Sequence, residues 1–339
     1  MANIILTNIC NRNCPYCFAR SEMEIRDADS SSDKFFMPMK NFLLILDFLE
    51  TNHFPELRLL GGEPTLHPDF AEIVSIAVSR GLKIQLFTNA VIPKAAFDAV
   101  CRYHDHIGVL ANINHPSTYS TKEWDKVCRT LKCLGNQLEI SFNIYHPEFD
   151  LTFISDLIDN FSLMRKVRLG IAAPIIGGKN RFVRYQDYSI IGDRLISQMS
   201  LLESRDIAFH FDCGFTCCMF NEKHGPVLFN SLIDVISKCN HPIDIGTDLS
   251  VWPCFPLSQF KMGKITRDTK MSDIEKAIHS ILEPFRILGM KDECADCKFK
   301  KRQQCMGGCI AHCIRAFQEN GDTEVVEKLK YQFSLVSFS

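Results

Sequence analysis

The sequence predicts an α/β fold in which parallel strands alternate with helices, followed by a smaller cysteine-rich region. Through about residue 176, short apolar runs of strand type alternate with longer segments whose apolar residues recur at helical spacing. Of the 16 cysteines, ten lie between Cys213 and Cys313 and three lie between Cys10 and Cys17. With 46% hydrophobic and 23% charged residues, the chain can bury a full core.

Taken in order, six segments are expected to be strands: residues 3–9, 56–62, 83–89, 106–114, 137–145 and 166–175. Helical spacing of apolar residues predicts helices at residues 39–52, 68–81, 93–104, 121–135, 150–163 and 190–206. Strands that alternate with helices at this interval form right-handed βαβ units and a parallel sheet. Six such strands predict a partial (β/α)6 TIM-like barrel, with its chemistry at the carboxyl ends of the strands.

The pattern changes beyond residue 176, where a connector with glycines and basic residues leads into short strands and dense cysteines. We expect the barrel core to cover residues 1–180. A connecting helical segment, with the start of the cysteine-rich region, is expected over residues 181–235. A small cysteine-rich domain should follow over residues 236–320, and a C-terminal tail over residues 321–339.

The charge balance argues against two classes of partner. The formal net charge is -2 and the pI is about 6.6, so no basic field indicates nucleic acid or an anionic membrane. The N-terminal segment lacks the features of a signal peptide, and no run of about eighteen apolar residues indicates a transmembrane helix. We therefore expect a cytoplasmic protein with no nucleic-acid or membrane partner.

The cysteines need an explanation other than structural disulfides, which are rare in a reducing cytosol. The scattered Cys101, Cys128 and Cys133 are interpreted as small buried apolar residues. The two clusters of cysteines are different, and metal binding is the first candidate for them.

The first cluster has the spacing Cys10-x3-Cys14-x2-Cys17 at the end of the first predicted strand. A loop of this size brings three thiolates to one face of a metal group, and no fourth cysteine or histidine follows closely in the sequence. Structural zinc and electron-transfer clusters usually take four protein ligands. Three ligands on a four-iron cluster leave one iron open to a substrate or cofactor. For this spacing alone, a zinc knuckle remains the alternative.

The stretch CNRNCPYC (10–17) resembles the signature of the radical S-adenosylmethionine (SAM) enzymes, and LRLLGGEP (57–64) resembles the motif after their second strand. The resemblance implies a [4Fe–4S] cluster on the three cysteines, with SAM bound to the open iron. It also implies cofactor contacts from Gly61, Gly62, Glu63, Pro64 and Tyr16. In these enzymes the reduced cluster cleaves SAM to a 5′-deoxyadenosyl radical, which abstracts hydrogen from the substrate.

Polar residues stand at the ends of the later predicted strands. They are expected to face the same rim and to contact the ribose, the carboxylate or the substrate: Thr88, Asn89, Asn112, Asn114, Ser141 and Asn143. Polar residues are common at strand ends in any barrel, so the alternative for each is that it makes no such contact.

The second cysteine region resembles the SPASM/twitch extension of many radical SAM enzymes, through CMGGC (305–309) and the Cys294-x2-Cys297 pair before it. The resemblance implies one or two auxiliary [4Fe–4S] clusters. One set of ligands would be Cys239, Cys254 and Cys309 with Cys213 or Cys218, and the other would be Cys294, Cys297, Cys305 and Cys313. Zinc is the alternative for four of these thiols.

Three departures from the extension's pattern leave open whether there are one or two auxiliary clusters. Seven residues separate Cys297 from Cys305, Leu249 stands where glycine is usual, and Cys313 follows Cys309 closely. Cys217, beside Cys218, is one thiol more than the ligand sets require. It is interpreted as a buried neighbour, as a cluster ligand, or as a catalytic hydrogen donor to a substrate radical, which would make the enzyme an epimerase.

An auxiliary cluster in this branch implies a ribosomally made peptide or a protein as substrate, changed by crosslinking, oxidation or epimerisation. The chain begins nine residues before its first cysteine. We therefore expect the leader of a peptide to be recognised by a separate protein or by the connector with Lys179, Arg181 and Arg184. A reductase, a flavodoxin or a ferredoxin would donate the electron. The alternatives are a radical SAM dehydrogenase or epimerase of a small molecule such as an aminoglycoside or sugar, and a non-catalytic metal-binding scaffold.

Overall fold

The computed structural model describes residues 2–20, 24–25, 35–220, 239 and 242–338. Part of the predicted connecting segment, residues 221–235, lies outside these ranges. In the part of the chain that is described, no helix is both long enough and apolar enough to cross a bilayer.

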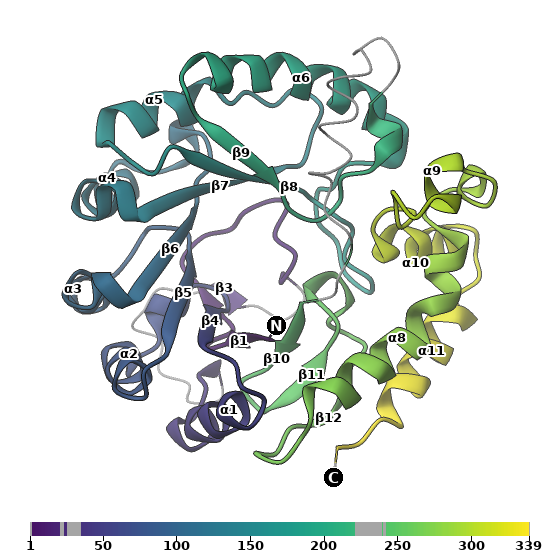
Figure 1. Ribbon diagram of the computed structural model, residues 1–339, viewed down its shortest axis with the longest axis horizontal. Helices are drawn as coiled ribbons and strands as arrows, with labels where there is room; N and C mark the ends of the chain where they lie inside the picture. The colour runs from purple at the N-terminus through teal and green to yellow at the C-terminus, as the bar shows by residue number, and fades with distance from the viewer. Residues whose placement is uncertain (1, 21–23, 26–34, 221–238, 240–241, 339) are drawn as a thin grey trace.

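A ten-stranded sheet forms the centre of the molecule and curves round it (Figure 1). Its strands neighbour one another in the order β12, β11, β10, β1, β4, β5, β6, β7, β8, β9. Their bounds are β1 Ala2–Ile5, β4 Glu56–Leu60, β5 Lys83–Thr88, β6 Ile107–Asn112, β7 Leu138–Ile144, β8 Lys166–Ile171, β9 Ala208–Phe211, β10 Ile243–Ile245, β11 Ser250–Trp252 and β12 Met262–Lys264. From β10 to β9 every neighbouring pair is parallel, whereas β11 and β12 are added antiparallel.

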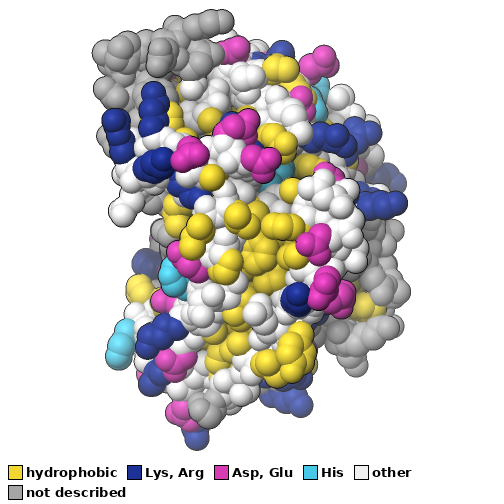
Figure 2. All heavy atoms as spheres, turned by 90° about the vertical axis from the view of Figure 1, so that its right-hand side faces the viewer, with side chains coloured by type: hydrophobic (Ala, Val, Ile, Leu, Met, Phe, Trp, Pro, Cys, Tyr) yellow, Lys and Arg dark blue, Asp and Glu magenta, His cyan; other side chains and the backbone are white. Residues whose placement is uncertain are grey.

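Helices cover the outside of this sheet (Figure 1). Those between the parallel strands are α1 Met39–Thr51, α2 Phe70–Ser79, α3 Lys94–Arg102, α4 Thr121–Leu134, α5 Thr152–Phe161 and α6 Tyr188–Ser204. The C-terminal helices form a separate group on the right of Figure 1, the side that faces the viewer in Figure 2, and they are α8 Met271–Leu288, α9 Lys298–Lys301, α10 Ile310–Glu319 and α11 Glu324–Ser334. Of these, α11 contacts β12. A short pair of strands, β2 Ile9–Cys10 and β3 Glu24–Ile25, lies outside the main sheet.

The alternation of the sequence explains which side of each strand is buried. In β5, Ile84 and Leu86 are almost fully buried under the helices, whereas Gln85 and Phe87 are half-buried on the inner side. The inner side therefore carries polar and aromatic residues, and the outer side carries the apolar core.

The prediction of a partial α/β barrel is confirmed, and all six predicted strands are present. The sheet does not stop near residue 180, because β9 follows α6 and β10 pairs with β1 in the register Ala2↔Ile243. The region expected to form the small cysteine-rich domain is thus joined to the barrel by main-chain hydrogen bonds. These bonds place the two cysteine regions on one scaffold.

Candidate active site

The cysteine loop, residues 10–17, begins at the carboxyl edge of the sheet. The backbone of the motif after β4 holds the chain that leads into this loop. Gly62 N donates to Thr7 O at 2.8 Å, and Glu63 N donates to Ile9 O at 2.8 Å. The second motif of the resemblance is therefore bonded through its main chain to the residues that lead into the first motif.

This contact requires glycine at positions 61 and 62. A Cβ atom on Gly62 would lie 2.0 Å from Ile9 O, and one on Gly61 would lie 2.5 Å from Thr7 O. Gly61 also has φ +150°, a conformation that favours glycine. These glycines therefore allow the backbone after β4 to lie close to the chain that enters the cysteine loop.

Glu63 is fully buried, with 0% of its surface exposed. Its Oε1 accepts hydrogen bonds from Thr65 Oγ1 at 2.6 Å and Thr88 Oγ1 at 2.8 Å, and its Oε2 accepts one from Asn89 N at 2.7 Å. Burial raises the pKa of this carboxyl, although these hydrogen bonds lower it in part. A buried carboxylate among neutral donors fits a cationic ligand group, such as the ammonium of SAM.

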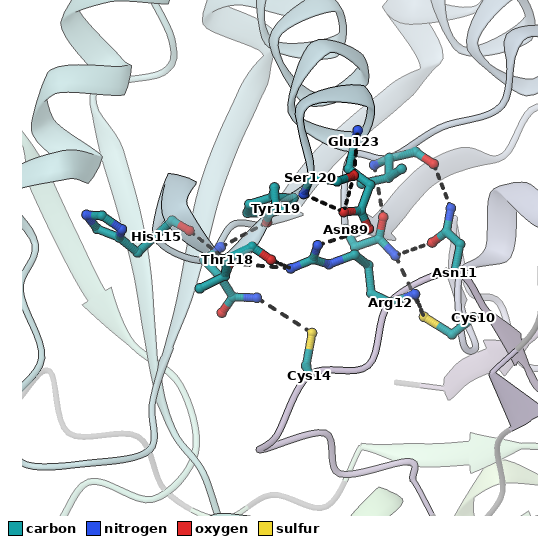
Figure 3. Close-up of polar contacts among 12 residues, drawn as sticks. Cys10, Asn11, Arg12, Cys14, Asn89, His115, Thr118, Tyr119, Ser120 and Glu123 are labelled. Carbon is teal, nitrogen blue, oxygen red and sulfur yellow. Dashed lines mark hydrogen bonds and ion pairs between the residues drawn. The ribbon is translucent and has the colours of Figure 1, made fainter.

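Two asparagine amides point at cysteine sulfurs. Asn89 Nδ2 lies 3.7 Å from Cys10 Sγ, which Figure 3 shows, and Asn114 Nδ2 lies 3.6 Å from Cys14 Sγ. An N–H group directed at a ligand sulfur stabilises the thiolate and tunes the potential of an iron–sulfur centre. Both residues are expected from the sequence at the rim, and the structure places them against the thiols.

Arg12, inside the cysteine loop, is a functional residue that the sequence reasoning missed. Its Nη1 bonds Glu123 Oε1 at 3.0 Å, and its Nη2 donates to Thr118 O at 3.1 Å. The guanidinium lies 3.8 Å from the centre of the Tyr119 ring. Arg12 thereby fastens the loop to the start of α4 (Figure 3), and no local pattern marks it because Glu123 is 111 residues away.

Tyr16, expected to contact adenine, is buried and stacks on Tyr145 with ring centroids 4.9 Å apart. The connector that the sequence offered for leader recognition packs on the same loop. Asn180 Nδ2 donates to Tyr16 O at 3.2 Å, and Arg181 N donates to Pro15 O at 2.8 Å. The connector is thus part of the wall around the cysteine loop.

Polar side chains line the inside of the barrel beyond this loop. Asn143 Nδ2 donates to Asn112 Oδ1 at 3.1 Å. Arg168 of β8 contacts Asp212 Oδ2 at 2.5 Å and donates to Ser141 Oγ at 3.4 Å. The Arg168 and Asp212 side chains remain 23% and 31% exposed, so a ligand can reach them. Asp212 directly precedes the first of the C-terminal cysteines.

Nine of the ten C-terminal cysteines fall into two groups, and Cys313 is in neither. The thiols of the first group lie close enough to act on one another electrostatically, and they are Cys213, Cys239, Cys254 and Cys309. Arg286 of α8 donates to Cys239 O at 2.6 Å and places a positive charge beside this group. The group matches the first predicted ligand set, with Cys213 as its fourth member.

Leu249, which stands where the motif usually has glycine, lies in the turn between β10 and β11. Its φ of +72° is in the left-handed region that favours glycine. Its side chain is buried in the core. The chain therefore makes the turn for which glycine is usual, and burial of the leucine offsets the backbone strain.

The second group lines a cavity, and it consists of Cys217, Cys218, Cys294, Cys297 and Cys305. The predicted ligand Cys313 is buried in α10 and is not among the residues that line this cavity. Cys217, offered as a hydrogen donor, is buried, and its thiol donates to Gln304 O at 3.6 Å and lies near Cys305.

The thiols of the first loop fit the implied iron–sulfur cluster. Burial and the neighbouring Cys14 raise the pKa of Cys17 to about 11, and burial raises the pKa of Cys10. Such thiols lose their protons when a metal binds them. Among the described residues, no three His, Cys, Asp or Glu side chains converge closely enough for a single metal ion. A cluster binds each thiolate to a different iron, so wider spacing of the sulfurs suits it better than one ion.

The fold and the site together define a class: a partial α/β barrel with a three-cysteine loop and a buried carboxylate at the carboxyl edge of its strands. Residues 4–136 match the model of the Radical SAM superfamily. The chain therefore carries a radical SAM domain. This finding confirms the predicted resemblance over residues 4–136, the part of the chain that would hold the [4Fe–4S] cluster and SAM.

Two curated relatives match part of the chain. The S-adenosylmethionine-dependent nucleotide dehydratase of Selenomonas ruminantium is 32% identical over 120 residues, which cover 34% of this chain and 40% of that protein. The PqqA peptide cyclase of Rhodopseudomonas palustris is 33% identical over 87 residues, which cover 26% of this chain and 21% of the cyclase. The matched region thus spans less than half the length of either relative.

Solved structures share the fold over almost the whole chain. Streptococcus suis SuiB bound to its precursor peptide SuiA has a TM-score of 0.68 and 17% identity, over 93% of this chain and 72% of SuiB. The enzyme anSMEcpe with bound AdoMet has a TM-score of 0.64 and 15% identity, over 97% of this chain and 98% of that one. The likeness therefore includes the C-terminal cysteine region as well as the barrel.

Proposed function

We propose that this chain is a radical SAM enzyme that modifies a ribosomally made peptide or a protein by crosslinking, oxidation or epimerisation. When bound, SAM on a reduced [4Fe–4S] cluster supplies the radical chemistry. Cys10, Cys14 and Cys17 would hold the cluster, and Glu63 would bind the SAM ammonium. Asn89 and the main chain after β4 hold the loop and the carboxylate in register, which is the positioning that such chemistry needs.

The observation that carries the proposal is the open polar lining inside the barrel. A Cβ atom on Gly170 would lie 2.7 Å from Asn143 Oδ1 and 3.8 Å from Asp212 Oδ2, so both side chains pack against this glycine. Arg168 pairs with Asp212, and both side chains remain partly exposed. A substrate group placed there would have both a donor and an acceptor of charge-assisted hydrogen bonds.

Two of the similar proteins support a peptide or protein as substrate, whereas the nucleotide dehydratase of Selenomonas ruminantium supports the small-molecule alternative. SuiB was solved with a precursor peptide bound and shares the fold over 93% of this chain, and the PqqA peptide cyclase is related in sequence. A separate leader-binding protein and an electron donor of the reductase, flavodoxin or ferredoxin type belong to the same proposal.

The radical activity is tested with the anaerobically reconstituted full chain, SAM and dithionite. We expect 5′-deoxyadenosine to form, and we expect none from the variant in which Cys10, Cys14 and Cys17 are all alanine. If the reconstituted chain forms no 5′-deoxyadenosine, the chain is a non-catalytic metal-binding scaffold and the proposal is wrong.

The substrate class is tested by adding short peptides encoded near the gene and following their masses. We expect one of them to lose hydrogen, or to exchange hydrogen with solvent deuterium, in a SAM-dependent manner. Arg168→Gln should lower this modification at least tenfold while 5′-deoxyadenosine still forms. Arg165→Gln, which removes an exposed ion pair with Asp159 and hydrogen bonds to the carbonyls of Arg205 and Asp206, is the matched control. Modification of an aminoglycoside or sugar, with every peptide left unchanged, would refute the peptide assignment.

A further inference from the structure

The cavity lined by the second group of cysteines lies apart from the radical SAM loop. Its volume is about 390 Å³, and five cysteines line it together with two lysines, Lys291 and Lys300, and two acidic residues, Glu293 and Asp296. The cavity therefore offers enough thiols for a metal–sulfur group.

Three separate segments bring these thiols together. Cys217 begins the short helix η7 (Cys217–Met219), which packs so closely on α6 that a Cβ atom on Gly192 would lie 1.9 Å from Met219 O. Cys294 ends the short helix η10 (Asp292–Cys294). Cys297 caps α9, and Cys305 follows that helix. The described backbone thus fixes the four thiols from three directions.

Glycines make the room that the cavity needs. A Cβ atom on Gly289 would lie 3.0 Å from Cys294 Sγ and 3.4 Å from the Cα atom of Gly307. Both glycines have positive φ, +79° and +81°. Side chains at these positions would displace the thiols, so the backbone is arranged around the group that the cavity accepts.

We propose that this cavity holds a second auxiliary [4Fe–4S] cluster on Cys294, Cys297, Cys305 and Cys217. The fourth ligand then comes from the segment after β9, and Cys313 is not a ligand. A single zinc ion is disfavoured because no three suitable side chains among the described residues converge on one point. A cluster needs its four thiolates on four different irons around a larger volume.

Cys217 fits the fourth position better than its two neighbours do. Its side chain is 1% exposed, it lines the cavity, and its thiol already contacts Cys305. Cys218 is exposed and shares a hydrogen bond of 3.2 Å with Thr216 Oγ1. Cys313 lies near Cys294 but is not among the residues that line the cavity. The contact between Cys217 and Cys305 would open to admit the irons.

The test uses the full chain with Cys10, Cys14 and Cys17 replaced by alanine, so that only auxiliary clusters remain. This background should bind about eight irons per chain and, because every iron has a thiolate, should give no [3Fe–4S] signal in electron paramagnetic resonance after mild oxidation. Adding Cys217→Ala should lower the iron content to about four or produce a [3Fe–4S] signal. Adding Cys218→Ala or Cys313→Ala should leave both readouts as in the background.

The readouts also separate a lost ligand from a lost fold. If Cys217→Ala removed all iron, the Cys217→Ser variant would distinguish a lost ligand from a lost fold. A serine ligand keeps the cluster but shifts the signal of its reduced form. An unshifted signal would overturn the proposal. Loss of iron in Cys313→Ala with full retention in Cys217→Ala would also overturn it, as would about four irons, or zinc, in the background. Because no readout depends on SAM cleavage, these outcomes are independent of the proposed function.

Discussion

Replacing Gly62 by alanine tests whether the main chain after β4 sets the position of the cysteine loop. The new Cβ atom would lie 2.0 Å from Ile9 O, 2.4 Å from Ile9 C and 2.9 Å from Cys10 N. All three are backbone atoms of the chain entering the loop, so the loop itself has to move. The movement would break the bonds from Gly62 N to Thr7 O and from Glu63 N to Ile9 O.

The magnitude follows from these contacts. Forcing an extra carbon into a packed site costs about 1–3 kcal/mol. Each lost main-chain hydrogen bond costs about 0.5–1.5 kcal/mol. We therefore expect Gly62→Ala to lower the free energy of unfolding by about 2–6 kcal/mol. We also expect it to impair reconstitution of the first cluster, because Cys10 lies directly beside the clash.

The assay is urea unfolding followed by circular dichroism, together with iron content after anaerobic reconstitution. Gly81→Ala is the control: no atom lies within 4 Å of its Cβ position, and its φ of +78° costs about 1–2 kcal/mol on substitution. If Gly62→Ala were no less stable than Gly81→Ala and bound a full complement of iron, the role assigned to this contact would be refuted.

Three further changes have defined outcomes. Glu63→Gln removes the buried negative charge but keeps an acceptor, so SAM should bind at least tenfold more weakly by equilibrium dialysis, and unchanged affinity would contradict a role for the carboxylate. Arg12→Lys keeps the charge but loses the two-pronged contact and ring stacking, so a chelator should strip iron faster than from the wild type; equal rates would contradict the anchoring role. Burial lowers the pKa of His67, whose neutral ring accepts from Asp69 N at 3.1 Å and bonds Met37 O at 2.9 Å. The stabilisation that the neutral His67 ring gives to the folded state is therefore complete above a pH of about 6.5, and it is lost as the pH falls toward the lowered pKa. His67→Gln, but not the exposed His104→Gln, should flatten the fall in the urea midpoint below that pH, and an identical fall in both variants would contradict the assignment.

Local patterns were enough to predict several features correctly. The predicted strand at residues 83–89 is β5, because Ile84 and Leu86 alternate with less buried residues. The helix expected at residues 121–135 is α4, which begins with a capping box of Ser120 and Glu123 and ends at Gly135 with φ +48°. Such signals lie within a few residues of one another, so a single sequence displays them.

Other features depend on residues that are distant in the sequence. The pairing of β10 with β1 places Ala2 opposite Ile243. The sequence of neither short apolar strand predicts that the other will be its neighbour. The same applies to the C-terminal thiols, where the resemblance to the SPASM/twitch extension grouped Cys313 with Cys305 while the fold brings Cys217 near that thiol.

The sequence by itself determined the class of this protein, since the three cysteines of the first loop and the Gly61–Glu63 motif are local and chemically specific. Only the tertiary structure decided what holds that loop: Gly62 against Ile9, and Arg12 against Glu123. Only the tertiary structure sorted the C-terminal thiols into two groups. The physical reason is that metal ligands and buried charges are stabilised by neighbours in space, and the folding of a sheet brings such neighbours together from any separation along the chain.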